Sequence, residues 1–346
     1  MSRPAGKSHR NATMRDVAKR AGVSVQTVSN LVNGRAGTMS EETRERVSQA
    51  MVVLNYRPNA SARGLRSART RELGFLLLDD DAKFLADPMT DMIMAGAGDV
   101  TRENGYGLLI QSARHGEIDD GLLRPLLESR VDGAILYLSG EPDSRDVFVK
   151  RVAELGHPAV VFGETRDGEL PSVTAANFDG AHRLATHLIE KGHTRIAFVA
   201  ARTSWPMIEE RYSGYRAALQ DAGIEPERDL QLFRGRWDAR SGAEMAANLL
   251  ELRDPPTAIM AANDLLALGA MRSAMSKGLR VPEDVAVSGF NDFDFSAFVE
   301  PALTTVSIPV YEMGRKAAAG VIDLLEGGSA DPSFGFPVEI IMRAST

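Results

Sequence analysis

Four residues within a stretch of six positions have side chains that could read the edges of DNA bases: Val25, Gln26, Ser29 and Asn30. The amides of Gln26 and Asn30 can each donate and accept hydrogen bonds as a pair, which matches the edge of adenine. A valine can contact the methyl group of thymine. This chemistry requires one exposed stretch of helix that can enter a major groove.

The surrounding residues predict such a helix. In MRDVAKRAGVSVQTVSNLVNG, apolar residues recur at spacings of three and four, which predicts two short helices. Gly22 permits a tight turn between them, and Ser24 can cap the second helix. A third helix is expected after Ser40, with two glutamates in its first turn. Residues 12–58 therefore predict a small all-α helix-turn-helix domain; the alternative is a helical bundle whose polar residues are merely exposed.

Further polar residues of this segment suit the phosphate backbone, which positions a protein without reading sequence. The predicted backbone contacts are Thr13, Ser24, Thr27, Asn33, Arg44, Tyr56 and Asn59. In the hinge that follows, residues 59–71, Leu65 is the only large apolar residue and is flanked by arginines. An exposed apolar side chain can part a base step in the minor groove while neighbouring cations hold the DNA backbone. We expect Leu65 to be this side chain and Ala62, Leu65 and Arg66 to form the minor-groove contact. A plain solvated linker is the alternative.

The charge distribution separates the chain into a basic head and an acidic remainder. Residues 1–71 contain 14 Lys+Arg and 4 Asp+Glu, a net charge of +10, so the net charge of -7 for the whole chain leaves -17 for residues 72–346. A DNA backbone attracts the head and repels the remainder.

Composition bounds the remaining classes of function. The chain has no cysteine, which excludes disulfides and thiolate metal sites and favours a reducing cytosol. Residues 1–11 are predicted to be a basic arm, and no apolar signal-peptide core follows them. Because no apolar run could span a bilayer either, a cytoplasmic protein without a membrane partner is expected.

Eight short apolar runs alternate with longer helical patterns after residue 72. They are ELGFLLL, GYGLLIQ, VDGAILYL, PAVVF, TRIAFVA, DLQLF, PTAIMAA and DVAVSGF. Such runs are typical of parallel strands buried under helices. They predict an α/β domain of two doubly wound lobes over residues 72–346, with the chain crossing between lobes near residues 162, 291 and 335.

Residues that follow these strands should line a cleft, because ligands of open parallel sheets bind beyond the carboxyl ends of the strands. The candidates are Asp79–Asp81, Asp87–Met89, Tyr137–Ser139, Gly163, Glu164, Arg202–Trp205, Arg211, Trp237, Asn263, Asp264, Asn291 and Asp292. Paired polar groups with tryptophans for stacking suit a small neutral polar ligand. In the alternative interpretation, Asn263 and Asp264 only cap a helix and Trp237 belongs to the core.

No catalytic or cofactor motif emerges, so neither an enzyme nor a cofactor is expected. Gly96 and Gly98 lie within a helical pattern and lack the third glycine of a dinucleotide site. His182 and His187 are five residues apart, a spacing that does not put them on one helix face. A sugar-binding protein and an enzyme of sugar or nucleotide metabolism remain as alternatives; the first needs a signal peptide and the second a catalytic pair.

The head resembles the LacI/GalR family of repressors in DVAKRAGVSVQTVSNLVNG, SEETRERV and NYRPNASARGLR, which occur in order. The resemblance implies a homodimer whose paired hinge helices insert Leu65 at the centre of a pseudo-palindromic operator. One reading position departs from the family, since Asn30 stands where Arg is common. A different preferred half-site is therefore expected.

The remainder is similar to the effector domain of the same family, itself like periplasmic sugar-binding proteins. The matching segments are HLIEKGHTRIAFV, ERYSGYRAAL, MAANDLLALGAM, VPEDVAVSGFND and PALTTVSIP. The resemblance implies regulation by a small effector, a sugar or a purine-type corepressor. It assigns effector contacts to Arg211, Trp237, Asn263 and Asn291, with Asp264 and Asp292 in support, and Asp87 joins them from the strand-following set. Asn291 and Ile308 depart from the family's usual Asp and Gln or Arg, so the effector's identity is not implied.

Overall fold

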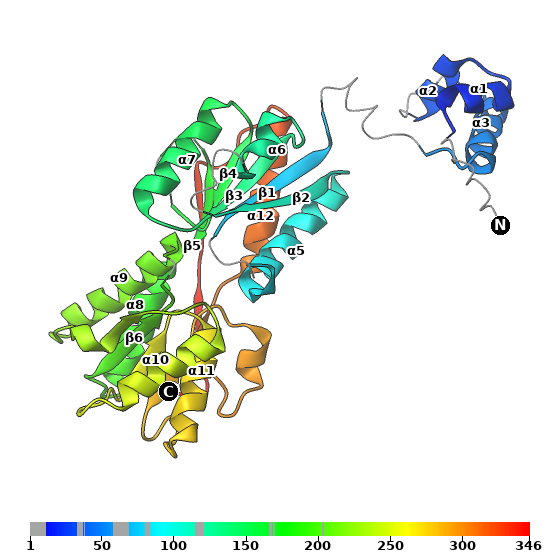
Figure 1. Cartoon of the computed structure of the whole chain (residues 1–346). Helices are drawn as coiled ribbons and strands as arrows, with labels where there is room; N and C mark the ends of the chain where they lie inside the picture. Colours follow the sequence, from blue (N-terminus) through cyan, green and yellow to red (C-terminus); the bar gives the residue numbers. More distant parts are fainter. Residues whose placement is uncertain are drawn as a thin grey trace, which may run out of the picture. The chain divides into compact units, whose positions relative to one another are not determined.

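The computed structural model describes residues 12–32, 37, 39–57, 69–79, 84–114, 121–165, 168, 170–202 and 204–346. The chain forms two compact units, Met1–Thr70 (the head) and Arg71–Thr346 (the body). Figure 1 shows the elements of each. The predicted basic arm, residues 1–11, and most of the predicted hinge lie outside the described residues.

The head is the predicted three-helix domain. Its helices are α1 (Met14–Ala21), α2 (Val25–Val32) and α3 (Glu41–Val53). Gly22 ends α1 with a φ of 66°, a left-handed conformation that glycine adopts without strain. The Ser24 hydroxyl accepts a hydrogen bond from the Thr27 backbone N–H at 3.1 Å and so caps α2. Val17, Val28 and Val47, one from each helix, are buried together in the core of the head.

The first lobe of the body is a six-stranded parallel sheet with the strand order β11-β5-β4-β3-β1-β2. Its strands are β1 (Glu72–Leu78), β2 (Gly107–Ala113), β3 (Gly133–Leu138), β4 (Ala159–Phe162), β5 (Ser172–Ala175) and β11 (Ser333–Phe336). Its helices are α5 (Pro88–Glu103), α6 (Arg124–Leu127), α7 (Pro142–Glu154) and α12 (Val310–Leu325), with the short 3-10 helix η1 (Phe84–Ala86).

Helices cover both faces of this sheet, which explains the unbroken apolar run of β1. Phe75 and Leu77 pack with residues of α5 and α12, whereas Leu76 and Leu78 pack with residues of α6 and α7. Successive side chains of a strand point to opposite faces, so a strand with helices on both sides is apolar throughout.

The second lobe repeats this design with the strand order β7-β6-β8-β9. Its strands are β6 (Ile196–Ala200), β7 (Gln231–Phe233), β8 (Ala258–Ala261) and β9 (Ala286–Ser288), followed by the antiparallel pair β10 (Thr305–Ser307) and β12 (Glu339–Ile341). Its helices are α8 (Asn177–Glu190), α9 (Pro206–Asp221), α10 (Ala239–Leu250) and α11 (Asp264–Ser276), with the 3-10 helices η3 (Arg228–Leu230) and η4 (Asp294–Ala297). Residues of α8 and α9 pack on one face of the sheet, and residues of α10 and α11 pack on the other.

Strands occur in all eight predicted runs, but four short strands were not predicted: β5, β10, β11 and β12. Two of them correct the crossings between lobes. Because β5 still belongs to the first sheet, the chain crosses after Ala175 rather than near residue 162. The next crossing follows β10 rather than residue 291, because Asn291 and Ser307 form a bridge that keeps β10 beside the second lobe. The last crossing lies between β11 and β12, close to the expected residue 335.

Close contact between α5 and α12 depends on Gly96. A Cβ atom at this position would lie 2.0 Å from the backbone oxygen of Tyr311 on α12. Gly98, two residues further along the same helix, would place its Cβ in open space. The two glycines that failed as a dinucleotide motif therefore differ in their structural roles.

Substituting these glycines separates the two roles. Gly96→Ala should lower the free energy of unfolding by about 1–3 kcal/mol, because α12 must move away. Gly98→Ala should raise it by up to about 1 kcal/mol through helix propensity. Urea denaturation of both variants measures the difference; equal effects would show that the helix contact is not tight.

Candidate functional site

Three of the four predicted reading residues stand on the accessible side of α2. Val25 is 43% exposed, Gln26 is exposed and Asn30 is half-buried. The Gln26 Nε2 donates a hydrogen bond to the Asn30 Oδ1 at 2.9 Å. The two amides that suit adenine are thus already bonded to each other.

Ser29 does not fit the role of a base-reading residue. It is only 4% exposed. On the helix it lies on the same side as Val28 and Val32, which face the core of the head. Ser29 was predicted to read bases because it lies near the N-terminus of the second helix, but its side of the helix faces the core.

Five of the residues predicted to contact the DNA backbone lie in the described part of the chain, where they take part in helix caps, an ion pair or the core of the head. Thr13 caps α1 in a capping box with Asp16, and the Ser24 hydroxyl lies 2.9 Å from that of Thr27. Arg44 forms an exposed ion pair with Glu41 at 3.4 Å, and Tyr56 packs against the core of the head. Five predicted DNA contacts lie outside the described residues: Asn33, Asn59, Ala62, Leu65 and Arg66.

In the body, one pocket lies at the carboxyl ends of strands from both lobes. In each sheet the order of strands reverses between the first strand and its neighbour, at β1 and β3 in one lobe and at β6 and β8 in the other. Such switch points are where open parallel sheets bind ligands. Asp87 follows β1, Tyr137 lies near the end of β3, Trp205 follows β6 and Asn263 follows β8.

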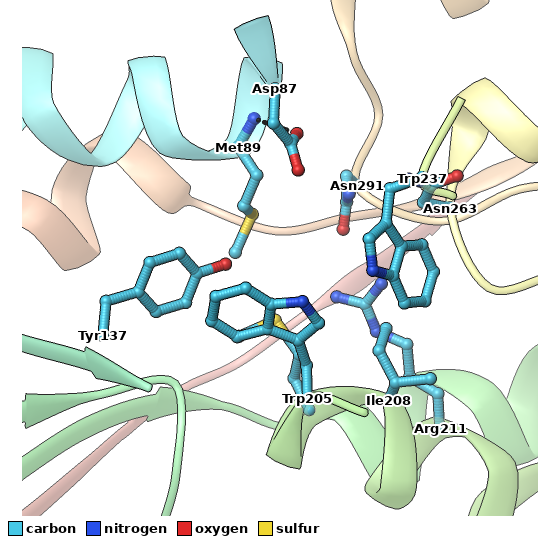
Figure 2. Close-up of a pocket in the computed structure, with 10 residues that line it drawn as sticks. Asp87, Met89, Tyr137, Trp205, Ile208, Arg211, Trp237, Asn263 and Asn291 are labelled. Atoms are coloured by element: carbon cyan, nitrogen blue, oxygen red, sulfur yellow. Dashed lines mark hydrogen bonds between the residues drawn. The ribbon is translucent and has the colours of Figure 1, made fainter. Parts of the chain in front are cut away.

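The pocket is partly open to solvent, and the space between its walls, open solvent included, is about 300 Å³. Ten residues line it: Asp87, Met89, Tyr137, Trp205, Met207, Ile208, Arg211, Trp237, Asn263 and Asn291. Figure 2 shows the labelled side chains pointing toward one another. The sequence did not predict Met207 and Ile208. Met207 lies four residues before Arg211, one helical turn, so helical spacing could have found it.

Three buried polar atoms of this pocket have no hydrogen-bond partner among the described residues: Arg211 Nη2, Trp237 Nε1 and Asn291 Oδ1. Leaving such an atom unsatisfied costs on the order of 1–3 kcal/mol, so most buried polar atoms are paired. Two donors and one acceptor, all in one pocket, are therefore suited to a polar ligand.

The Arg211 side chain is held rigidly. Its Nε donates to the Asn177 Oδ1 at 2.9 Å, and its Nη1 donates to the Ala262 carbonyl at 2.7 Å. The guanidinium carbon lies 3.9 Å from the centre of the Phe290 ring. Burial lowers the pKa of Arg211 to about 9, which still leaves the group charged at neutral pH.

Asn263 lines the pocket and also caps α11, because its Oδ1 accepts a hydrogen bond from the Leu266 N–H at 2.9 Å. Asp264 and Asp292, which the resemblance grouped with the effector contacts, do not line it. Asp292 instead accepts from Arg343 at 2.7 Å.

Asp264 is fully buried and holds the loop that carries Asn291. Its Oδ2 accepts from the Phe293 N–H at 2.8 Å and from the Ser296 hydroxyl at 2.9 Å, and its Oδ1 accepts from the Thr305 hydroxyl at 2.6 Å. Burial raises the pKa of Asp264 to about 6, although these hydrogen bonds oppose the shift.

Three histidines contact other side chains and do not line the pocket. His182 contacts Asp221, His187 contacts Thr346 and His193 contacts Thr257. Among the described residues, no three His, Cys, Asp or Glu side chains cluster as metal ligands would. Among the same residues, no helix has the length and apolar character needed to cross a membrane.

Comparisons with known proteins cover nearly the whole chain. The family model "Bacterial regulatory proteins, lacI family" matches residues 13–59, and "Periplasmic binding protein-like domain" matches residues 185–346. The chain is 35% identical to the HTH-type transcriptional regulator RegA of Clostridium saccharobutylicum, over 96% of this chain and 99% of that protein.

Solved structures agree with this match. A lac repressor dimer bound to operator and the anti-inducer ONPF has a TM-score of 0.87 and 28% identity, covering 97% of this chain and 99% of that one. A complex of the transcriptional regulator CelR with cellobiose has a TM-score of 0.71 and 30% identity, covering 97% of this chain and 100% of that one.

The buried Asp264 should make stability fall as pH rises. Its pKa is about 6 in the folded protein and near 3.8 when unfolded, so between these values only the unfolded state loses the proton. The cost accumulates from pH 4 to pH 6 and then stays constant, on the order of 3 kcal/mol. Asp264→Asn should remove this part of the pH dependence, measured as the free energy of unfolding at each pH.

Asp284→Asn is the matched control. Arg280 lowers the pKa of this exposed carboxyl to about 2, so Asp284 contributes stability that is lost only as pH falls below about 4. Its variant should keep the wild-type slope between pH 4 and pH 6. An unchanged slope in Asp264→Asn would contradict the assignment to Asp264.

Proposed function

The chain belongs to the lacI family of bacterial regulatory proteins, and from this premise we propose a specific mode of regulation. It acts as a homodimeric transcription repressor. Two heads read a pseudo-palindromic operator, and each body binds a small neutral polar effector, a sugar or sugar derivative, between its lobes. The proposal includes no catalytic step and no cofactor.

The observation that carries the effector proposal is the set of three unpartnered polar atoms on Arg211, Trp237 and Asn291. Sugar hydroxyls both donate and accept, so one small molecule can satisfy donors and an acceptor together. The indole rings of Trp205 and Trp237 offer apolar surface for a sugar ring. The bound cellobiose of the CelR structure supports this class of ligand.

Effector binding regulates the head through the angle between the lobes. A ligand that binds one arrangement of the lobes more tightly shifts the population toward it. Operator affinity changes by the same difference in free energy. Induction, in which the effector releases DNA, is the sense that we propose.

On the DNA side, Val25, Gln26 and Asn30 are the proposed base contacts, because they stand on the accessible side of α2. Thr13, Ser24, Thr27, Asn33, Arg44, Tyr56 and Asn59 are proposed for the backbone. The minor-groove role of Ala62, Leu65 and Arg66 is proposed from the sequence.

Base reading can be tested by selecting a half-site from random DNA. Asn30→Ala should lose preference at one base pair, with a loss of about 1–3 kcal/mol of discrimination. Ser29→Ala should keep all preferences, because Ser29 is buried. Arg44→Ala should weaken selected and random DNA alike and reduce the salt dependence by about one phosphate contact. The repressor proposal fails if the wild type binds selected and random DNA equally.

A thermal-shift screen with neutral sugars and with purines tests the effector proposal. A sugar at about 100 times its Kd should stabilise the body by about 2.7 kcal/mol. Trp237→Phe removes the Nε1 donor and keeps an aromatic ring, so it should weaken binding of that sugar by about three- to tenfold. Phe298→Leu, at an exposed position outside the pocket lining, is the control. A purine hit, or no effect of Trp237→Phe, would contradict the sugar assignment.

A further inference from the structure

The two lobes touch directly beside the pocket. Tyr137 of the first lobe and Trp205 of the second lie with ring centres 4.2 Å apart and ring planes at 31°. Next to them, the Gly140 N–H of the first lobe donates to the Ser204 carbonyl of the second at 2.9 Å. One wall of the pocket is therefore formed across the boundary between lobes.

An ion pair joins the lobes at the same place. Arg145 lies on α7 in the first lobe and Glu209 lies on α9 in the second, and Figure 1 shows these helices one above the other. The Arg145 Nη1 lies 3.4 Å from the Glu209 Oε1, and Nη2 lies 3.5 Å from Oε2. The Ser204 hydroxyl donates to the Glu209 Oε1 at 2.6 Å, which orients the carboxylate.

The two ends of this ion pair are held very differently. Arg145 is only 1% exposed, and within its own lobe it donates to the Gly140 carbonyl and pairs with Glu164 at 3.0 Å. Its charge is therefore compensated without Glu209. The Glu209 side chain is 42% exposed, so solvent and salt weaken its attraction to Arg145. Arg145 is therefore held in the first lobe, whereas Glu209 can separate from it.

Glu209 also lies on the segment that forms the pocket wall. Met207, Ile208 and Arg211 belong to the same two turns of α9, and all three line the pocket. A change in the angle between the lobes would change the Arg145–Glu209 distance together with the position of this wall.

We propose that Arg145 is a positioning residue that fastens the two lobes through Glu209 and so sets how closed the pocket is before a ligand arrives. The fastening is a property of the body and needs neither ligand nor DNA. Its regulatory meaning rests on the proposed function, because a ligand that prefers the closed lobes binds more tightly when closure is already favoured.

Tryptophan fluorescence can report on this contact selectively. The chain has two tryptophans, and both line the pocket. In a Trp237→Phe background the emission comes from Trp205 alone, which stacks on Tyr137 across the boundary. Quenching by acrylamide then measures how often the lobes separate.

Glu209→Gln is the test variant, because it removes the charge on the releasable side and leaves Arg145 paired with Glu164. At about 20 mM salt, the ratio of closed to open lobes should fall about two- to fivefold and quenching should rise. The quenching of the parent protein should rise toward that of the variant at about 0.5 M salt, where charges are screened within a few ångströms. The variant should respond little to salt.

Glu251→Gln is the matched control. Glu251 is exposed and pairs with Lys277 at 2.7 Å, with both residues in the second lobe. It should quench as the parent does at every salt concentration. Glu209→Asp keeps the charge but shortens its reach, so it should give an intermediate result and serves in place of Glu209→Gln if that variant does not fold.

The proposal is overturned if the Glu209 variants quench like the parent at low salt, or if Glu251→Gln changes quenching equally. Because no ligand or DNA is used, this failure is distinct from a failure of the proposed function, which the screens of sugars and DNA reveal.

Discussion

The burial of a single guanidinium organises the second lobe. A cation removed from water must be surrounded by oriented dipoles, and Arg211 obtains them from the side chain of Asn177 on α8 and the carbonyl of Ala262 after β8. The Phe290 ring beyond β9 packs over its face. Arg211 therefore ties a helix to the ends of two strands, and these contacts leave its one unsatisfied nitrogen in the pocket. The same hydrogen bonds that hold the Arg211 side chain rigid also direct its unpaired nitrogen into the pocket.

Asp264 does not line the pocket, but it fixes the position of a loop that does. The loop beyond β9 contains two consecutive residues with positive φ, Asn291 at 107° and Asp292 at 57°. Such backbone is strained for residues other than glycine and persists only where its surroundings hold it. Asp264 accepts hydrogen bonds from Phe293 and Ser296, which hold this loop, and a third from Thr305, which ties the same carboxylate to β10. Asn291 is thereby kept at the pocket. The family resemblance grouped Asp264 with the effector contacts, but it did not distinguish residues that contact a ligand from residues that support those contacts.

The sequence predicted the helices and strands that have a clear apolar pattern, and it missed features that depend on how the elements pack together. The three head helices have periodic apolar residues and the eight predicted strands lie in continuous apolar runs, and all were found. β5 (SVTA) and β10 (TVS) are rich in serine and threonine and form no apolar run, so they were not predicted and the crossings between lobes were placed too early. The burial of Ser29 depends on which face of α2 meets the other helices of the head. Spacing along one helix does not contain that information.

The hydrogen bond between Gln26 and Asn30 has a consequence for the proposed reading of DNA bases. This hydrogen bond fixes the orientation of each amide relative to the other, so the two side chains present their remaining donors and acceptors as one unit. Replacing either residue alters the surface offered by the other. The energetic effects of changes at these two positions are then non-additive. In the proposed role as base contacts, a change at one of the two positions would also alter what the other offers to DNA, so new specificities would arise through coupled rather than independent substitutions.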